Sequence, residues 1–501
     1  MEFQAGGLRA DGVRYDSPMA VQNRWIVVAA GLVLGALIVM KPSRGAAAES
    51  PAQAQPSKQQ ATEAVPPEDS APPFGARPAT AKLPYDTEYP ALHYTRAAAN
   101  NAIARLQTRL DRGEVKLQFR PGRGYLDSLL AALGIDPSSQ SLVYSKTSLQ
   151  VGSIQAATPR AIYFNDDTYV AWVQGSDQME LGAMDSDLGQ VFYTFRNRAG
   201  DTARFQRENA NCLSCHDTYS LSGGGVPRFL LMSAYVDVHG EQLTHEGSIL
   251  VTDQTQMKYR WGGWYVTGQH GAQVHLGNIQ VHNVQELVQL EEVRRGNLDT
   301  LDGLFDTHPY LTDKSDIVAL IVLLHQVTVQ EFITRVNFEV RQAFSTASGT
   351  AAVGATKGGV PTLSAKTVTA LEADMDDLVN AMLFVDAAGY SGKITGNSGF
   401  DRWFEARGIH DSHGRSLRDL DLTSRLLKYP LSYLIYSESF DALPAYAKNY
   451  VYGRLAAVLS GKDQSKPYAH LSAGDRKAML EILTATKPEF AAAMSSKETA
   501  P

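Results

Sequence analysis

The pattern of apolar and polar residues divides the start of the chain into three segments. Residues 25–40, WIVVAAGLVLGALIVM, form an uncharged and mostly apolar run that follows Arg9, Arg14 and Arg24. The run is shorter than a typical membrane-spanning helix of about 17–25 residues and longer than a signal-peptide core of about 7–15. Two interpretations fit this length: an uncleaved membrane anchor, or the apolar core of a signal peptide that is cleaved near Ala48. Either would leave residues 1–24 in the cytoplasm and export the rest of the chain.

Residues 41–84 are rich in Ala, Pro, Gln and Ser and contain almost no large apolar residues. Such a segment cannot bury enough apolar surface to offset the entropy lost when a chain becomes ordered. We expect a flexible tether between the apolar run and a globular part.

Residues 85–200 combine a helix with a sheet. Apolar residues recur at helical spacing from residue 85 to about 112. Between 142 and 195 the chain instead shows short stretches rich in β-branched and aromatic residues, such as RAIYFNDDTYVAWVQ and GQVFYTFRN, separated by Asp, Gly and Asn. This alternation predicts a small antiparallel sheet.

Residues 301–495 are predicted to be helical. The segment 312–344 lacks Gly and Pro, and its centre is apolar nearly all round, which is typical of a buried helix. Further helices are expected over 366–389, 416–460 and 474–495, with a loop at 349–366. The fold class is therefore mainly α with a smaller antiparallel β portion (α+β), and not a doubly wound sheet.

Charge and cysteine content narrow the function. The 501-residue chain has a net charge of −7 and no long basic stretch, so nucleic acid is not expected as a partner. Its two cysteines, Cys212 and Cys215, are followed at once by His216 in the sequence ENANCLSCHDTYS. Cys-x-x-Cys-His is the attachment sequence of haem c, in which two thiols bind the porphyrin and the histidine ligates the iron. A redox dithiol, a disulfide and a zinc site are the alternatives, but zinc would want further ligands at compact spacing.

The motif resembles that of c-type cytochromes over residues 201–300. The resemblance implies one covalently attached haem c, with Cys212 and Cys215 as attachment sites and His216 as the proximal iron ligand. It also implies that the carbonyl of Pro227 accepts a hydrogen bond from the second ring nitrogen of His216, which would orient the ligand. An ordinary turn proline is the alternative. We expect a cytochrome c-like haem-binding core with helical extensions.

The wider chain is similar to a family of larger exported bacterial proteins that carry one cytochrome c motif. The similarity lies in TPRAIYFNDD, RWGGWYVTGQHG and SDIVALIVLLHQ. That family has no assigned activity, so it implies no substrate.

The second axial ligand of the iron decides between electron transfer and small-molecule chemistry. His270 and His275 lie 54 and 59 residues after His216, beside two tryptophans, and are the preferred candidates for a distal ligand. The other candidates are Met232, His245, Met257, His282 and His325.

Two further assignments concern pairs of charged residues. Arg204 and Arg207 precede the motif and could pair with haem propionates, or lie on a solvated face. Asp166 and Asp167 are expected in a hairpin turn, with a calcium or substrate role as the alternative.

These observations predict an exported, membrane-tethered monohaem cytochrome c that transfers electrons to redox partner proteins in or at the membrane. Its location would be the periplasmic side of the bacterial inner membrane, or the periplasm if the signal is cleaved. The alternative is a haem c-dependent oxidoreductase, a peroxidase or an oxidase/dehydrogenase, acting on a small molecule. The length of the chain after the tether, several times what one electron-transfer haem needs, favours this alternative.

Overall fold

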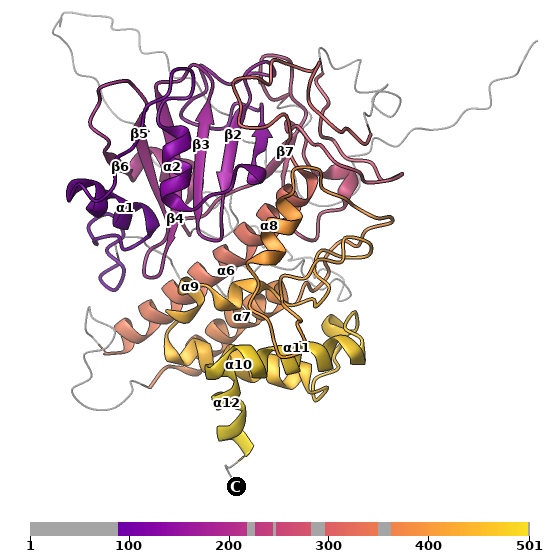
Figure 1. The fold of residues 1–501 in the computed structure, drawn as a ribbon. Coiled ribbons are helices and arrows are strands. Elements are labelled where there is room, and N and C mark those ends of the chain that lie inside the picture. The colour runs from indigo at the N-terminus through magenta and orange to yellow at the C-terminus, as the bar shows by residue number, and fades with distance from the viewer. Residues whose placement is uncertain (1–88, 218–225, 244–246, 282–295, 349–361, 499–501) are drawn as a thin grey trace, which may run out of the picture.

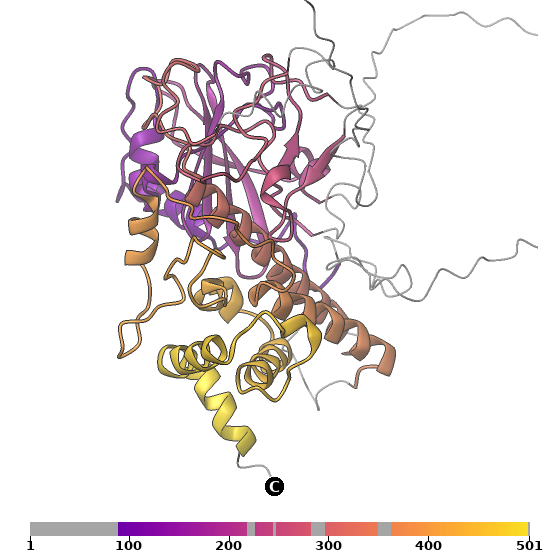
Figure 2. The same cartoon turned by 90° about the vertical axis from the view of Figure 1, so that its right-hand side faces the viewer.

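The computed structural model describes residues 89–217, 226–243, 247–281, 296–348 and 362–498. The predictions for residues 1–84 and for His245 and His282 lie outside the described residues, as does most of the loop predicted at 349–366. In the described part, a β-rich layer lies against a group of helices (Figures 1 and 2). The mixed α and β architecture expected from the sequence is confirmed.

The predicted sheet is present and has six antiparallel strands in the order β1-β2-β3-β4-β5-β6, so each strand pairs with its neighbour along the chain. The strands are β1 (Ser141–Val143), β2 (Arg160–Phe164), β3 (Thr168–Val173), β4 (Gln178–Asp185), β5 (Gly189–Arg196) and β6 (Phe205–Glu208).

The two faces of the sheet pack differently. One face supplies Tyr163, Trp172 and Phe195 to a core that also contains residues of α1 (Ala102–Asp111) and α2 (Leu126–Leu133). The opposite face carries two rows of cross-strand neighbours, because residues paired across antiparallel strands point to the same side. The first row is Phe164, Tyr169, Gly182, Phe192 and Glu208. The second is Ile162, Ala171, Glu180, Thr194 and Gln206. We call this the motif face.

The long predicted helix is α6 (Ile317–Ser348), which runs through the centre of the molecule (Figure 1). Among the described helices it alone is long and apolar enough to cross a membrane, but 94% of its most apolar window is buried inside the protein. It is the central helix of a core that also takes Phe164 and Tyr169 from the sheet. Asp316 caps its first turn, with Oδ1 accepting the Val318 amide at 2.7 Å.

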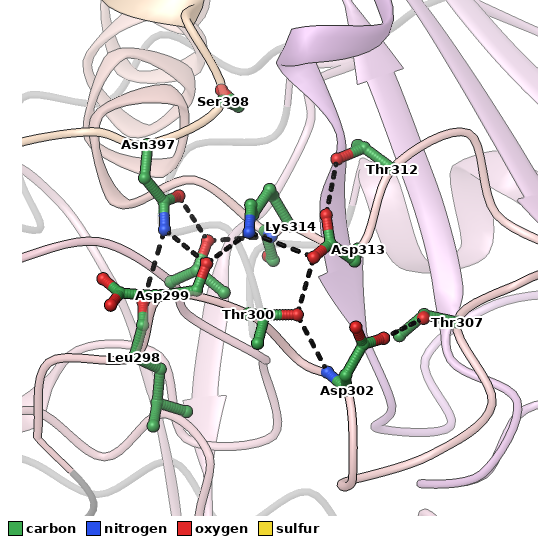
Figure 3. Close-up of polar contacts among 12 residues, drawn as sticks. Leu298, Asp299, Thr300, Asp302, Thr307, Thr312, Asp313, Lys314, Asn397 and Ser398 are labelled. Carbon is green, nitrogen blue, oxygen red and sulfur yellow. Dashed lines mark hydrogen bonds and ion pairs between the residues drawn. The ribbon is translucent and has the colours of Figure 1, made fainter.

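A network of polar contacts holds the segment that leads into α6 (Figure 3). The Thr300 hydroxyl donates to Asp313 Oδ2 at 2.6 Å, and Lys314 Nζ lies 3.0 Å from the same oxygen. Asn397 Nδ2 donates to the Asp299 carbonyl at 2.8 Å. Segments on both sides of residue 300 are therefore packed as one unit with the helices.

The remaining helices are α7 (Ala365–Met382), α8 (Phe400–Ala406), α9 (Glu438–Asp441), α10 (Ala445–Leu459), α11 (Ala473–Thr486) and α12 (Pro488–Glu498). The helices expected over 366–389, 416–460 and 474–495 are shorter or divided in the structure, and α8 was not predicted.

Prolines account for two of these differences. The continuous helix expected over 416–460 is wrong, because the chain makes turns up to Ser432 and becomes regular only in α9 and α10. Pro430 and Pro444 lie in this stretch, and a proline cannot donate the hydrogen bond that a helix interior requires. The helix expected over 474–495 is similarly divided before Pro488.

The region 201–300 differs most from expectation. Its described residues contain one α-helix, α3 (Ala210–His216), and a two-stranded ribbon of β7 (Met232–Ala234) and β8 (Ser248–Leu250). A separate, cytochrome c-like helical core is not seen in them. Residues 205–208 pair with β5 as strand β6. The Cys-x-x-Cys-His sequence therefore begins at the edge of the six-stranded sheet and not within a helical domain of its own.

Candidate functional site

Helix α3 places both thiols and the imidazole at the edge of the motif face. The chain leaves β6 at Glu208 and enters α3 one residue later, at Ala210. Cys212 and Cys215 are three apart and therefore neighbours on the helix surface. No residue of α3 is fully buried, and Cys215 is exposed. Within the described residues, both thiols are therefore free, and neither is fully buried.

His216 is held as a neutral imidazole with a defined tautomer. Its Nδ1 lies 2.7 Å from the carbonyl oxygen of Arg228. Because a carbonyl can only accept, Nδ1 carries the hydrogen and Nε2 keeps its lone pair. Burial lowers the pKa of His216 to about 4, and the positive charges of Arg160 and Arg228 act in the same direction. The imidazole is therefore uncharged at neutral pH, the form that binds a metal.

The hydrogen bond predicted between His216 and the carbonyl of Pro227 forms one residue later along the chain. The acceptor is the Arg228 carbonyl and not that of Pro227. The Arg228 amide also donates to the His216 carbonyl at 3.1 Å, so the two residues are joined twice. Pro227 has no hydrogen to donate at this position, which explains why the double contact forms at the residue after it.

Two phenyl rings hold the imidazole from the side of the sheet. The ring centroid of Phe192 lies 4.5 Å from that of His216, and the centroid of Phe229 lies 5.8 Å away at a steep angle. Phe229 in turn lies against Gly182, where an added Cβ would come within 2.3 Å of its ring. The absence of a side chain at Gly182 is therefore what lets Phe229 reach His216.

A buried charge network on α6 fixes the loop that bears the Arg228 carbonyl. The Arg228 guanidinium forms an ion pair with Glu331, and Arg335 Nη2 lies 2.6 Å from the other oxygen of Glu331. All three side chains are at least nine-tenths buried. Glu331 therefore holds two cations, Arg228 and Arg335, with its two carboxylate oxygens.

The second row of the motif face is left partly open beside α3. Ile162, Ala171, Glu180 and Thr194 are half-buried, although they lie in the middle of strands. Glu180 and Glu208 both act on the pKa of Cys212, which places that thiol over this part of the sheet. The half-buried row therefore carries apolar and hydroxyl-bearing side chains beside α3.

The pKa of the Cys212 thiol argues against a redox dithiol at this site. Burial, together with Glu180, Glu208 and Cys215, raises the pKa of Cys212 to about 12. Reactive dithiols need the opposite shift, because the thiolate is the nucleophile. The described residues also contain no group of three His, Cys, Asp or Glu side chains placed to hold a metal ion.

The two arginines before the motif lie in different surroundings. Arg207 donates to the carbonyls of Ala97, at 2.6 Å, and Tyr94, and its guanidinium lies over the Tyr94 ring. Its donors therefore tie β6 to the N-terminal segment. Arg204 is exposed at the start of β6.

The structure does not bring His270 and His275 to His216. These two histidines are buried together, with ring centroids 4.6 Å apart. Their loop joins the start of α6, where the Ile317 amide donates to Thr267. His216 is instead bonded to the backbone of Arg228, whose side chain pairs with Glu331; that residue lies fourteen positions along α6 from Ile317, or about 21 Å at 1.5 Å per residue.

The other described candidates have partners of their own. Met257 lies in the main core, and Met232 is in β7. His325 is fully buried, and both of its ring nitrogens are bonded within the protein, to Asp253 and Ser432. Asp166 lies in the expected turn between β2 and β3, with Oδ2 2.6 Å from Arg418, and Asp167 Oδ1 accepts from Thr168.

Sequence analysis missed Phe192, Phe229, Arg228, Glu331 and Arg335. One signal was available: Glu331 and Arg335 are opposite charges four residues apart within an otherwise apolar helix. Charges at such positions are buried only when paired. Their partner on a distant loop could not be deduced.

Comparisons with models of protein families, with curated proteins and with solved structures found no match. The function is therefore inferred from the geometry of the site itself.

Proposed function

We propose that this protein is an exported, membrane-tethered monohaem c-type cytochrome that transfers single electrons. The observation that carries the proposal is His216: a neutral imidazole, its Nδ1–H bonded to a carbonyl, directly after two thiols on an uncovered helix. A haem-ligating histidine needs this tautomer, because Nε2 must offer a lone pair to the iron.

The residues present fit a covalently attached haem. Cys212 and Cys215 would form the thioether bonds, and His216 would be the proximal ligand. The half-buried residues of the second row, with Ile162, Ala171 and Thr194, offer a floor for a flat ring. When bound, the haem supplies a one-electron redox centre.

The protein's own contribution would be to hold the ligand and set the local charge. The Arg228 carbonyl fixes the ring of His216 and increases its basicity. The positive charges of Arg160 and Arg228, which act on His216, would favour the reduced state of a nearby redox centre, because that state carries one more electron.

Location and partners follow from the sequence. The apolar run at 25–40 would anchor the chain, and the segment 41–84 would let the redox domain reach partner proteins in or at the membrane. Tethering raises the effective concentration of partners on the same membrane.

A haem c-dependent oxidoreductase acting on a small molecule is the second candidate. The observation that favours it is the distance between His216 and the two histidines expected as distal ligands. An iron without a second protein ligand would be open to small molecules.

An optical spectrum of the purified full-length protein, oxidised and reduced, tests both functions. A low-spin reduced spectrum that carbon monoxide does not change supports electron transfer. A response to carbon monoxide supports the oxidoreductase instead.

Covalent attachment is tested separately with the double variant Cys212→Ala/Cys215→Ala. We expect this variant to lose the haem stain on a denaturing gel, whereas Ser214→Ala, an exposed change on the same helix that leaves both thiols in place, keeps it. If wild-type protein exported from a host that assembles c-type cytochromes carries no covalent haem, both candidate functions are wrong.

A further inference from the structure

A cavity of about 250 Å³ lies between the loop after β8 and the turns of the helical region. Asp253, Arg260, Phe384, Tyr390, Arg425 and His470 are among the residues that line it. None of these belongs to the site around His216. At about 30 Å³ per water molecule, the volume suits a ligand of about eight non-hydrogen atoms.

Arg260 supplies a buried positive charge to this cavity. The residue is only 2% exposed, yet no described aspartate or glutamate forms an ion pair with it. Its Nε donates to the Thr255 carbonyl at 2.7 Å and its Nη2 to the Asp253 carbonyl at 3.0 Å. Buried charges are normally paired, because desolvation of an isolated ion is costly. A guanidinium has five N–H donors, so these contacts leave capacity for a bound anion.

The second charged group, Asp253, is oriented by a buried chain of hydrogen bonds. Its Oδ2 lies 2.7 Å from His325 Nδ1, and His325 Nε2 lies 2.9 Å from the Ser432 hydroxyl. With a neutral imidazole, Nδ1–H donates to the carboxylate and the serine hydroxyl donates to Nε2. The carboxylate is thus held in a fixed orientation, with lone pairs left to accept a further hydrogen bond.

In this Asp-His-Ser chain the aspartate faces the cavity, whereas in a hydrolytic triad the serine faces the substrate. Ser432 is completely buried and does not line the cavity, and its hydroxyl also accepts the Leu434 amide at 3.3 Å. The aspartate is the end that opens on the cavity. His325 and Ser432 are therefore positioning residues for Asp253, and the arrangement does not support attack by a serine nucleophile.

The backbone of the cavity wall is strained. Phe384 and Asp386 both have φ of 57°, a conformation that residues other than glycine rarely adopt. The Phe384 ring stacks on His325, with centroids 4.2 Å apart. Such strain persists only where the surrounding structure imposes it, and it is concentrated at functional sites.

We propose that this cavity is a second binding site, for a small organic acid that carries a hydroxyl group next to its carboxylate. The carboxylate would neutralise Arg260, and the hydroxyl would donate to Asp253. Arg425 is already paired with Asp475 at 2.6 Å, so it is not the principal anion partner. A hydroxyl fits better than an ammonium group, because an ammonium needs three acceptors and Asp253 already accepts from His325.

Isothermal titration calorimetry on the full-length protein tests this site independently of the haem. The probes are unbranched two- to six-carbon carboxylic acids at pH 7, each with and without a 2-hydroxyl group. We expect at least one hydroxy acid to bind at least tenfold more tightly than its parent acid. If no acid in the series binds with a dissociation constant below about 10 mM, or if the hydroxyl makes no difference, the proposal is wrong.

Two variants locate the binding. Arg260→Gln should weaken binding of every acid at least tenfold, and Asp253→Asn should remove only the preference for the hydroxyl. Arg112→Gln, a change at an exposed residue directly after α1 that does not line the cavity, is the control. If Arg260→Gln does not fold, Tyr390→Phe provides the test, because Tyr390 bonds Arg260 and lines the cavity. Unchanged binding in the variants that fold would overturn the assignment.

Discussion

At the scale of single residues, the environment of His216 is built from groups that are far apart along the chain. The Arg228 carbonyl sets its tautomer, Phe192 and Phe229 hold its ring, and Glu331 fixes Arg228 from the central helix. The side-chain contacts can be removed by substitution without touching the thiols or the imidazole. Their effects can therefore be separated from the proposed haem attachment.

If His216 ligates a haem as proposed, Glu331→Gln should raise the midpoint potential of that haem. The change removes an anion that lies between two cations, and the loss of negative charge favours the reduced state. The expected increase is on the order of tens of millivolts, from Coulomb's law at an effective dielectric constant of about 20. An optically monitored redox titration measures it. Arg335→Gln should shift the potential in the opposite direction, and the exposed Glu114→Gln is the control. Equal potentials in all four proteins would show that the network does not act on the haem.

Gly182→Ala should disturb His216 through Phe229. The new Cβ would lie 2.3 Å from the Phe229 ring, so the ring must move. We expect the free energy of unfolding to fall by about 1–3 kcal/mol, as for other overpacked cores. Urea denaturation measures the loss. Gly152→Ala is the matched control, since its Cβ would meet nothing within 4 Å. A variant as stable as the control would contradict the role given to Gly182.

At the scale of elements, contacts between hairpin turns and helices join the β-rich and helical parts. The turn between β2 and β3 shows this most clearly. Asp166 reaches Arg418 at 2.6 Å and Arg407 at 3.1 Å, and the Arg418 guanidinium lies over the rings of Phe404 and Tyr433. The turn is thus an anchor between the sheet and the helical region, which is a structural role.

Asp166→Asn should destabilise the protein in a pH-dependent way. Burial raises the pKa of Asp166, but Arg418 and Arg407 lower it further, so the folded-state pKa is below the usual value near 3.8. The ionised carboxylate therefore contributes stability above pH 3.8, and this contribution is lost as the pH falls through the folded-state pKa. We expect a loss of about 1–3 kcal/mol at pH 7.

Urea denaturation of both proteins at pH 7 and pH 3 measures this difference. The gap between wild type and Asp166→Asn should narrow at the lower pH. Asp177→Asn, which removes an exposed ion pair with Arg198, should change stability by less than about 1 kcal/mol. A gap that widens at pH 3 would contradict the assigned sign.

At the scale of the whole molecule, the sheet and the helices share one core. Val143, Phe164 and Tyr169 of the sheet pack with α6, α7, α10 and α11 in a single cluster. Gln190 of β5 and Tyr169 of β3 also bond Gln330 of α6. The region 201–300 is therefore not expected to be stable without the helical region.

A chain that ends at residue 300 should fail to fold. It would lose α6 and expose the apolar residues of the sheet that pack against that helix. We expect it to lack near-ultraviolet circular dichroism and a cooperative urea transition. A chain that ends at residue 487 loses only α12, whose buried contact is mainly Phe490, and should unfold cooperatively with a few kcal/mol less stability. Cooperative unfolding of the shorter chain would show that the two halves are separate domains.

The sequence by itself determined the elements whose signals are local. The alternation of residue types identified the sheet, and the apolar stretch around residues 317–344 identified the central helix. Both patterns are local because buried positions recur with the known period of a strand or a helix. The Cys-x-x-Cys-His spacing identified the three residues at the centre of the site, since that chemistry requires neighbours on one helical turn.

Only the tertiary structure decided which distant groups surround those residues. The Arg228 carbonyl, the Glu331 pair and the Phe229 contact depend on how a loop crosses the sheet and meets α6, which no local pattern contains. The same holds for the separation of His270 and His275 from His216, and for the chain from Asp253 to Ser432. Spacing along the sequence limits how far apart two residues can be, but packing decides whether they meet.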